Sequence, residues 1–169
     1  MIDKLVDRLK QKIETNPDQC FFNAPAEWDE IESLEDDLIY VFPVSFKVFL
    51  CHFNGGFISL LGPAKTDNIE SSAWNSNYIL SLQEIRSAYE RIERKFHEDG
   101  KRYIPFMHTS GQEYLAFRWP YDEDETESKV YDIWHETFPT EWETQIVYDG
   151  FTDLLEDYIN NNGVIQTIG

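Results

Sequence analysis

The chain lacks the features that would place it in a membrane or outside a cell. Among its 169 residues no run of about 18 apolar residues occurs, which excludes a membrane-spanning helix. Residues 1–9 carry a charge every few positions and show no signal-peptide core. The two cysteines, Cys20 and Cys51, do not form a C-x-x-C pair, so neither a disulfide framework nor a cysteine zinc site is indicated. We therefore expect a cytoplasmic protein whose thiols are reduced.

Positive charge is also scarce. Lys and Arg number 14 against 32 Asp and Glu, which gives a formal net charge of −18. Nucleic acids and anionic membrane surfaces are bound through basic patches, so this balance argues against both as direct partners. It favours a basic protein partner that is drawn in by electrostatic steering, although solubility alone would also explain the acidity.

The motifs of common catalytic and cofactor sites are missing as well. None of the four histidines belongs to an H-E-x-x-H or C-x-x-C…H array, and no G-x-S-x-G or P-loop is present. His135 and Glu136 are neighbours, but a surface pair at the end of a strand explains them. We expect no metal, no cofactor and no catalysis. Because carboxylates are abundant, a hydrolase that uses a carboxylate pair stays open as an alternative.

What the chain does contain is enough apolar sequence for a packed core. Hydrophobic residues make up 41% of the chain and aromatic residues 15%, as is typical of a globular protein. At this length we expect one domain over residues 1–169, with an N-terminal helix and linker over 1–26. Apolar residues that recur every three or four positions predict helices over residues 2–14, 27–38, 43–54, 82–99 and 151–159.

The predicted strands come mainly after the first three helices. Short apolar runs predict strands over residues 57–61, 103–107, 114–119, 130–134 and, with a weaker pattern, 145–148. The remaining long segment, residues 64–80, is polar and reads as irregular. This order predicts an α+β domain with a mainly antiparallel twisted sheet, flanked by N-terminal helices, a long central helix and a C-terminal helix.

Three of the helices carry specific expectations. Four residues of helix 27–38 are expected to face the core: Trp28, Ile31, Leu34 and Leu38. In helix 43–54, Pro43 suits the first helical position, and Gly55 or Gly56 can take the left-handed conformation that ends a helix. The central helix is expected to bury Phe96 and to end at Gly100.

Several segments together match the pattern of one family. The pattern is an acidic helix, then L-P-x-x-[YF]-K-x-[FL]-L and N-G-G, an I-P-F…G…[YF]-L hairpin, and a closing S-F-x-x-[FL]-L helix. The matching residues are Ile31, Leu34, Leu38, Phe42-Pro43, Phe46-Lys47, Phe49-Leu50, Asn54-Gly55-Gly56, Ile104-Pro105-Phe106, Gly111, Tyr114-Leu115 and Phe151-Thr152-Asp153-Leu154-Leu155. Over about residues 27–160 the chain thus resembles the SUKH superfamily, the domain type of yeast cell-wall-assembly regulators (Smi/Knr) and of many bacterial proteins. It departs at Arg118, where many members have Asp, and at Ile39, where a Gly is usual.

This resemblance implies a protein that binds and does not catalyse. Bacterial SUKH proteins act as immunity proteins, each of which neutralises a toxin, often a nuclease. An acidic inhibitor fits that role, because a nuclease needs a basic cleft for phosphate. A regulatory scaffold of the cell-wall type is the alternative. The oligomeric state stays open, with a monomer favoured.

Charge distribution selects the candidate partner-binding residues. Residues 103–169 carry 14 acidic and 2 basic side chains, whereas residues 86–102 carry six basic ones. The candidates are carboxylates of an acidic loop and of helix 27–38, with two tryptophans as aromatic anchors: Asp122, Glu123, Asp124, Glu125, Glu127, Glu32, Glu35, Asp36, Trp119 and Trp134. The alternatives are a solvated loop and buried tryptophans.

Overall fold

The computed structural model describes residues 1–64, 68–92, 100–121 and 126–168. Within these ranges the helices are α1 (Ile2–Thr15), α2 (Trp28–Leu38), α3 (Val44–Leu50), α4 (Ile69–Trp74), α5 (Leu82–Arg91), α6 (Pro139–Trp142) and α7 (Phe151–Asn160). The strands are β1 (Cys20–Phe22), β2 (Gly56–Ile58), β3 (Tyr78–Ile79), β4 (Arg102–His108), β5 (Tyr114–Trp119), β6 (Val130–Asp132) and β7 (Ile146–Tyr148). The predicted α+β class is confirmed.

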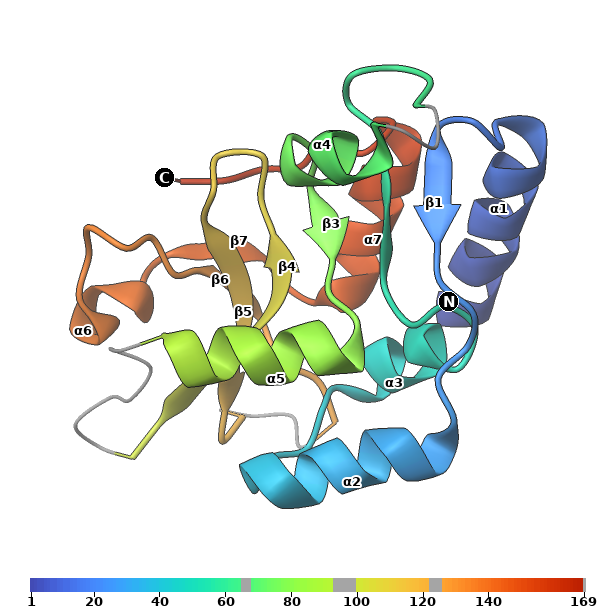
Figure 1. Ribbon diagram of the computed structural model, residues 1–169. Helices are drawn as coiled ribbons and strands as arrows, with labels where there is room; N and C mark the ends of the chain where they lie inside the picture. The colour runs from blue at the N-terminus through green and yellow to red at the C-terminus, as the bar shows by residue number, and fades with distance from the viewer. Residues whose placement is uncertain (65–67, 93–99, 122–125, 169) are drawn as a thin grey trace.

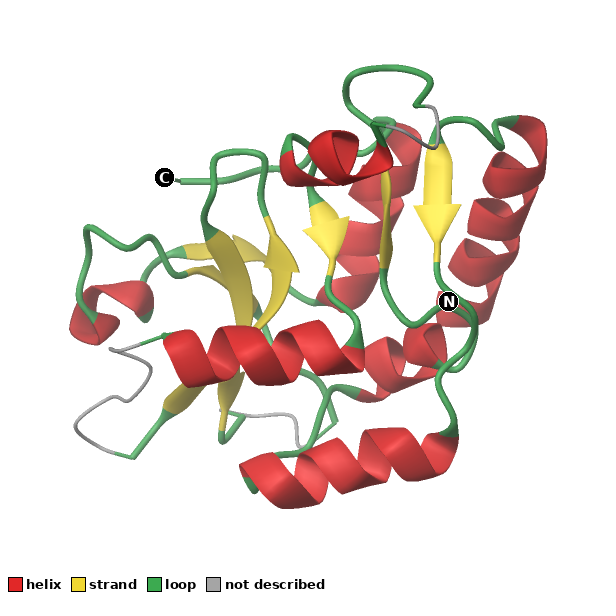
Figure 2. Cartoon of the chain, viewed as in Figure 1, coloured by secondary structure: helices red, strands yellow, loops and turns green. Residues whose placement is uncertain are grey.

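The seven described strands form one sheet in the order of the chain, from β1 to β7. Every neighbouring pair is antiparallel, as the sequence predicted. Helices α1, α3 and α7 pack against one another, while α5 packs on β4 and α2 packs on α5 (Figures 1 and 2). None of the helices in the described ranges is long and apolar enough to cross a membrane.

An aromatic cluster forms the centre of the core. Phe46 of α3 is fully buried, and its ring centroid lies 5.6 Å from that of Phe106, 5.2 Å from Phe117 and 5.1 Å from Phe151. The rings of Phe106 and Phe117 stack at 3.9 Å between β4 and β5, next to an irregularity in the strand register after Pro105. Offset and edge-to-face rings of this kind add to the free energy of simple burial. Phe46 therefore links the third helix to both the sheet and α7, and Phe49 adds a second contact with Phe151 at 5.4 Å.

The Asn-Gly-Gly segment has a different role from the one predicted. Helix α3 ends at Leu50, before the glycines, and Pro43 is the residue preceding its first turn. Gly56 belongs to β2, and a Cβ atom there would lie 2.5 Å from the Phe21 carbonyl oxygen. At Gly55 a Cβ atom would lie 2.6 Å from the Ile79 carbonyl oxygen. Gly55 does take the predicted left-handed conformation, with φ 80°, but after the helix has ended, and both glycines allow close approach of neighbouring backbones.

Short elements account for the other differences. Residues 20–22, predicted as linker, form β1, and the irregular segment contains α4 and β3. Strands β2, β6 and β7 are also only three residues long, but each lies within a predicted apolar run, whereas β1 and β3 were not predicted. The central helix is shorter than predicted: α5 ends at Arg91, and Ile92 is already extended. Phe96 lies outside the described residues.

Candidate functional site

Helix α2 separates a buried stripe from an acidic one. Its start is held by the Glu27 N–H, which donates a 2.9 Å hydrogen bond to the Glu30 carboxylate. Three of the four predicted core residues are buried, namely Ile31, Leu34 and Leu38. Trp28 was expected to face inward but is 46% exposed, because it begins the helix and its indole N–H donates to the Glu32 carboxylate at 2.7 Å.

Cations from other elements stabilise the acidic C-terminal end of α2. Carboxylates at this end interact unfavourably with the helix dipole. The Arg102 guanidinium, at the start of β4, donates to the carbonyl oxygens of Leu38 and Ile39. Arg86 of α5 forms a 2.7 Å ion pair with Asp37. The positive charge of this region therefore offsets the helix-end carboxylates.

The connector after α2 alternates between buried and exposed residues. Tyr40 and Phe42 are buried, with ring centroids 4.9 Å apart. Ile39 and Val41 are 78% and 41% exposed. Two large apolar side chains therefore lie at the surface beside the acidic stripe of α2.

Ile39, Tyr40 and Val41 of this connector line an open groove of about 580 Å³. The lining residues are Glu32, Glu35, Asp36, Ile39, Tyr40, Val41 and Trp119. Four of the predicted site residues, from helix α2 and from the end of β5, are thus brought together. Trp119 packs edge-on against Tyr40, at a centroid distance of 5.7 Å.

The buried Tyr40 forms the inner part of the groove. Its hydroxyl oxygen makes no hydrogen bond that meets normal geometry within the described part of the chain. Burial raises the pKa of Tyr40 well above its usual value, and the nearby Tyr121 hydroxyl raises it further, so the phenol stays neutral at physiological pH.

The three α2 carboxylates of the groove differ in what they already bind. Glu35 accepts a 2.7 Å hydrogen bond from the Phe42 N–H and lies 3.4 Å from the Lys47 ammonium, and its side chain is only 11% exposed. Glu32 is exposed and accepts from the Trp28 indole. Asp36 is exposed, and its carboxylate makes no hydrogen bond or ion pair to any other described residue. Glu35 therefore holds the connector in place, while Glu32 and Asp36 face solvent.

The predicted acidic loop begins and ends beside the same connector. Asp122, Glu123, Asp124 and Glu125 lie outside the described residues. Before them, the Tyr121 hydroxyl donates to the Val41 carbonyl oxygen. After them, the Thr126 carbonyl oxygen accepts a 2.9 Å hydrogen bond from the Val44 N–H. The two ends of the loop are therefore anchored within a few residues of the groove.

Glu127 is engaged within the molecule. Its carboxylate accepts hydrogen bonds from the Ser45 N–H at 2.9 Å and from the Ser45 hydroxyl at 2.7 Å. This places a negative charge at the N-terminal end of α3, where free N–H groups favour it. Sequence reasoning missed the contact because the partners are 82 positions apart.

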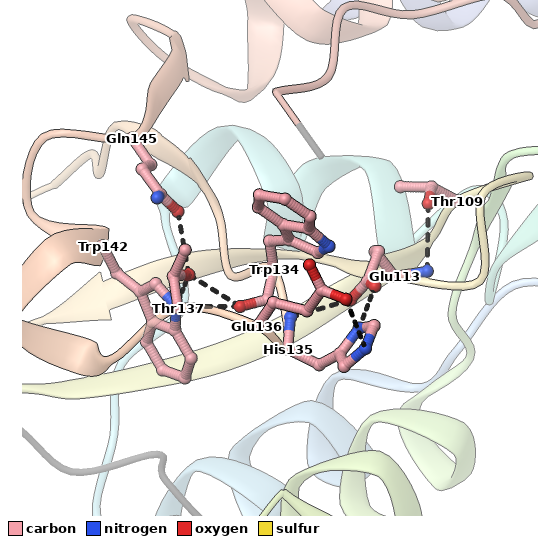
Figure 3. Close-up of polar contacts among 8 residues, drawn as sticks. All are labelled: Thr109, Glu113, Trp134, His135, Glu136, Thr137, Trp142 and Gln145. Carbon is pink, nitrogen blue, oxygen red and sulfur yellow. Dashed lines mark hydrogen bonds and ion pairs between the residues drawn. The ribbon is translucent and has the colours of Figure 1, made fainter.

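Trp134 lies at the opposite end of β5 from Trp119. It follows β6, next to Ile133, whose N–H donates to the carbonyl oxygen of Tyr114 at the first residue of β5. The Trp134 carbonyl oxygen accepts a 2.7 Å hydrogen bond from the Thr137 hydroxyl (Figure 3). The structure therefore does not bring Trp134 into the groove.

A buried carboxylate organises this second region. Glu113 is 7% exposed; it accepts a 3.1 Å hydrogen bond from the His135 N–H and pairs with the His135 imidazole (Figure 3). The sequence drew attention to His135 with Glu136, but those groups are 4.0 Å apart. Glu113, which sequence reasoning missed, is the principal partner of His135. Over the described ranges, no group of three His, Cys, Asp or Glu side chains is arranged to hold a metal ion.

The fold and the groove define the class of this protein. It is an α+β domain that presents apolar side chains and exposed carboxylates together on one surface. The sequence model of the SMI1/KNR4 family (SUKH-1) matches residues 25–157, and the chain belongs to this family. The matched range includes the groove and extends from α2 into α7, which confirms the predicted membership. Comparison with curated protein sequences gives no match.

Proposed function

We propose that this protein is an immunity protein that binds and neutralises a basic toxin domain, most simply a nuclease, without catalysis. The observation that carries the proposal is the groove, because solvent-facing Glu32 and Asp36 lie there with exposed Ile39 and Val41. We call these four residues, together with Trp119, the groove face. Apolar contacts surrounded by charge are the usual composition of a protein-binding surface.

Electrostatics supports a cationic partner. A nuclease carries a basic cleft for phosphate, and the net charge of −18 would accelerate its encounter with this protein. The acidic loop, Asp122–Glu125, is proposed as a second contact, because both of its ends are anchored beside the groove face. We also propose that residues 1–169 act as one domain in the cytoplasm, where an immunity protein meets the toxin.

The test is co-expression with the toxin domain encoded by a neighbouring gene. We expect protection of the cells, co-purification of the two proteins, and an association rate that falls steeply between low and physiological ionic strength. Absence of both protection and co-purification would overturn the proposal. A partner that co-purifies but is not toxic would instead support the regulatory alternative.

Matched charge reversals test the face itself. Glu32→Lys/Asp36→Lys should weaken binding about a hundredfold, because two attractive charges become repulsive. The control is Asp7→Lys/Glu14→Lys on exposed positions of α1, which changes the net charge by the same amount. The control should reduce affinity by about threefold or less at physiological salt. Equal losses for the two variants would show that total charge, and not the groove face, determines binding.

A further inference from the structure

Ile39 has a backbone conformation that is unusual for its side chain. It ends α2 with φ 51° and ψ 61°, in the left-handed region. The other non-glycine residues with positive φ in the described ranges are Gln112 and Asn162, and neither is branched at Cβ. A β-branched residue is strained in this region, because its Cβ substituents crowd the following carbonyl group.

The fold itself does not need an isoleucine here. The helix end uses only backbone groups of Ile39: its N–H donates to the carbonyl oxygens of Glu35 and Asp36, and its carbonyl oxygen accepts from Arg102. The side chain is 78% exposed and is not part of the hydrophobic core or of the residues packed against it. Glycine would supply the same hydrogen bonds without strain. The isoleucine therefore costs stability and contributes little buried area in return.

Its surroundings indicate what the side chain contacts. Ile39 lines the groove with Val41, and the solvent-facing carboxylates of Glu32 and Asp36 line the same groove. The ring of the buried Tyr40 lines the same groove, and the ring of Trp119 packs edge-on against it. A complementary surface would combine an apolar pocket with Lys or Arg side chains around it.

We infer that Ile39 is the apolar anchor of the groove face. Its side chain enters an apolar pocket on a cationic protein partner, and Glu32 and Asp36 pair with Lys or Arg residues at the rim of that pocket. This inference rests on the proposed function and specifies which residue of the groove face determines partner recognition. Stability is reduced in the free protein so that an apolar group is held at the surface.

The decisive variant changes stability and binding in opposite directions. Ile39→Gly relieves the strain, so the midpoint of thermal unfolding should rise by about 2–4 °C, reduced in part by the greater freedom of glycine in the unfolded chain. The same variant should weaken binding of the neighbouring toxin domain at least about tenfold. Ile39→Val keeps the branched apolar group and should bind within about threefold of wild type.

Two controls make the result specific. Leu61→Ser removes another exposed apolar side chain, 64% exposed and outside the groove, and should leave affinity unchanged. Cytochrome c, a basic protein unrelated to any toxin, measures attraction by charge alone. Its weak binding at low salt should be the same for wild type and Ile39→Gly.

The outcomes separate this inference from the proposed function. If Ile39→Gly binds the toxin domain as tightly as wild type and Glu32→Lys/Asp36→Lys binds it less tightly, Ile39 is not the anchor. The proposed function then stands. If neither variant lowers affinity, the groove face itself is wrong. A lower midpoint of unfolding for Ile39→Gly would overturn the inference, because the side chain would then serve the fold.

Discussion

At one end of strand β5, Trp119 lines a groove beside the exposed Asp36; at the other end, Glu113 is buried against His135, close to Trp134. Both ends combine a tryptophan, carboxylates and a nearby turn. They differ in whether the carboxylate already has partners inside the molecule. Asp36 has none among the described residues, whereas Glu113 accepts from both the backbone and the ring of His135.

The comparison shows that the number of acidic residues is a poor guide to a binding surface. Glu35 and Asp36 are adjacent in the chain, yet one is bound to Phe42 and Lys47 and the other faces solvent. A carboxylate that is largely buried and has two internal partners, as Glu35 is, stabilises the fold and has little capacity left for a ligand. The loss of unfolding free energy and of affinity on mutation can be measured for each carboxylate.

The largest expected effect separates the two adjacent carboxylates. Glu35→Ala leaves the Phe42 N–H and the Lys47 ammonium without their partner, so the free energy of unfolding should fall by about 3 kcal/mol. Asp36→Ala should change it by about 0.5 kcal/mol or less, because the side chain is exposed. Urea unfolding of both variants gives these values. Similar losses would contradict the assignment of Glu35 to the fold and Asp36 to the surface.

A smaller effect is expected at the other end of β5. Glu113→Ala removes the acceptor for the His135 backbone and ring, which should cost about 2 kcal/mol of unfolding free energy. Affinity for the toxin domain should remain within about twofold of wild type, since this end lies outside the groove face. Surface plasmon resonance at a temperature where the variant is folded measures the affinity. A marked loss of binding would move the proposed contact to the Trp134 end.

The smallest effect concerns His108, which pairs with Tyr114 at this same end. Its side chain is buried between the rings of Trp74 and Tyr78, at 4.8 and 5.1 Å, and burial, with a contribution from the Arg91 charge, lowers its pKa below the ordinary value of 6.5. The native state therefore binds this proton less readily than the unfolded state. Stability from this residue is complete above pH 6.5 and is lost as pH falls toward the lowered native pKa.

The measurement compares wild type with His108→Phe. Between pH 7.5 and 5.5, the unfolding free energy of wild type should fall more than that of the variant, by at most about 1.4 kcal/mol, the equivalent of one pH unit below the ordinary pKa. The carboxylates are the same in both proteins, so their titration cancels when the curve of the variant is subtracted from that of wild type. Parallel curves would show that His108 is accessible to protons in the native state.

The elements with strong periodicity or a continuous apolar run were predictable, whereas β1, α4 and β3 were not. Phe46 could be placed in the core because the apolar spacing of its helix is regular over two turns. Strands β1 and β3 were not predicted, although β2, β6 and β7 are also only three residues long and lie within predicted apolar runs. The glycines after α3 were recognised, but their role depends on backbones that approach from β1 and β3, and local sequence does not reveal that approach.

The candidate site was predictable in part for a similar reason. Glu32, Asp36 and Trp119 were selected from charge and aromatic character, and the structure places them in one groove. Glu35 and Glu127 carried the same signal, yet their hydrogen-bond partners, Phe42 and Ser45, are set by the tertiary fold. Ile39 was visible only as a missing glycine. Its exposure and backbone conformation came from the structure.

The order of the sheet has a consequence for synthesis of the chain. Each strand pairs with the one made just before it, so sheet formation can follow the growing chain from β1 to β7. Helix α1 is made first, but it packs against α7, which is made last, and Arg8 reaches across to Glu156 at 3.8 Å. Until residues 151–160 leave the ribosome, the face of α1 that packs against α7 lacks its final cover. The packing of α1 is therefore completed only when α7 has been synthesised.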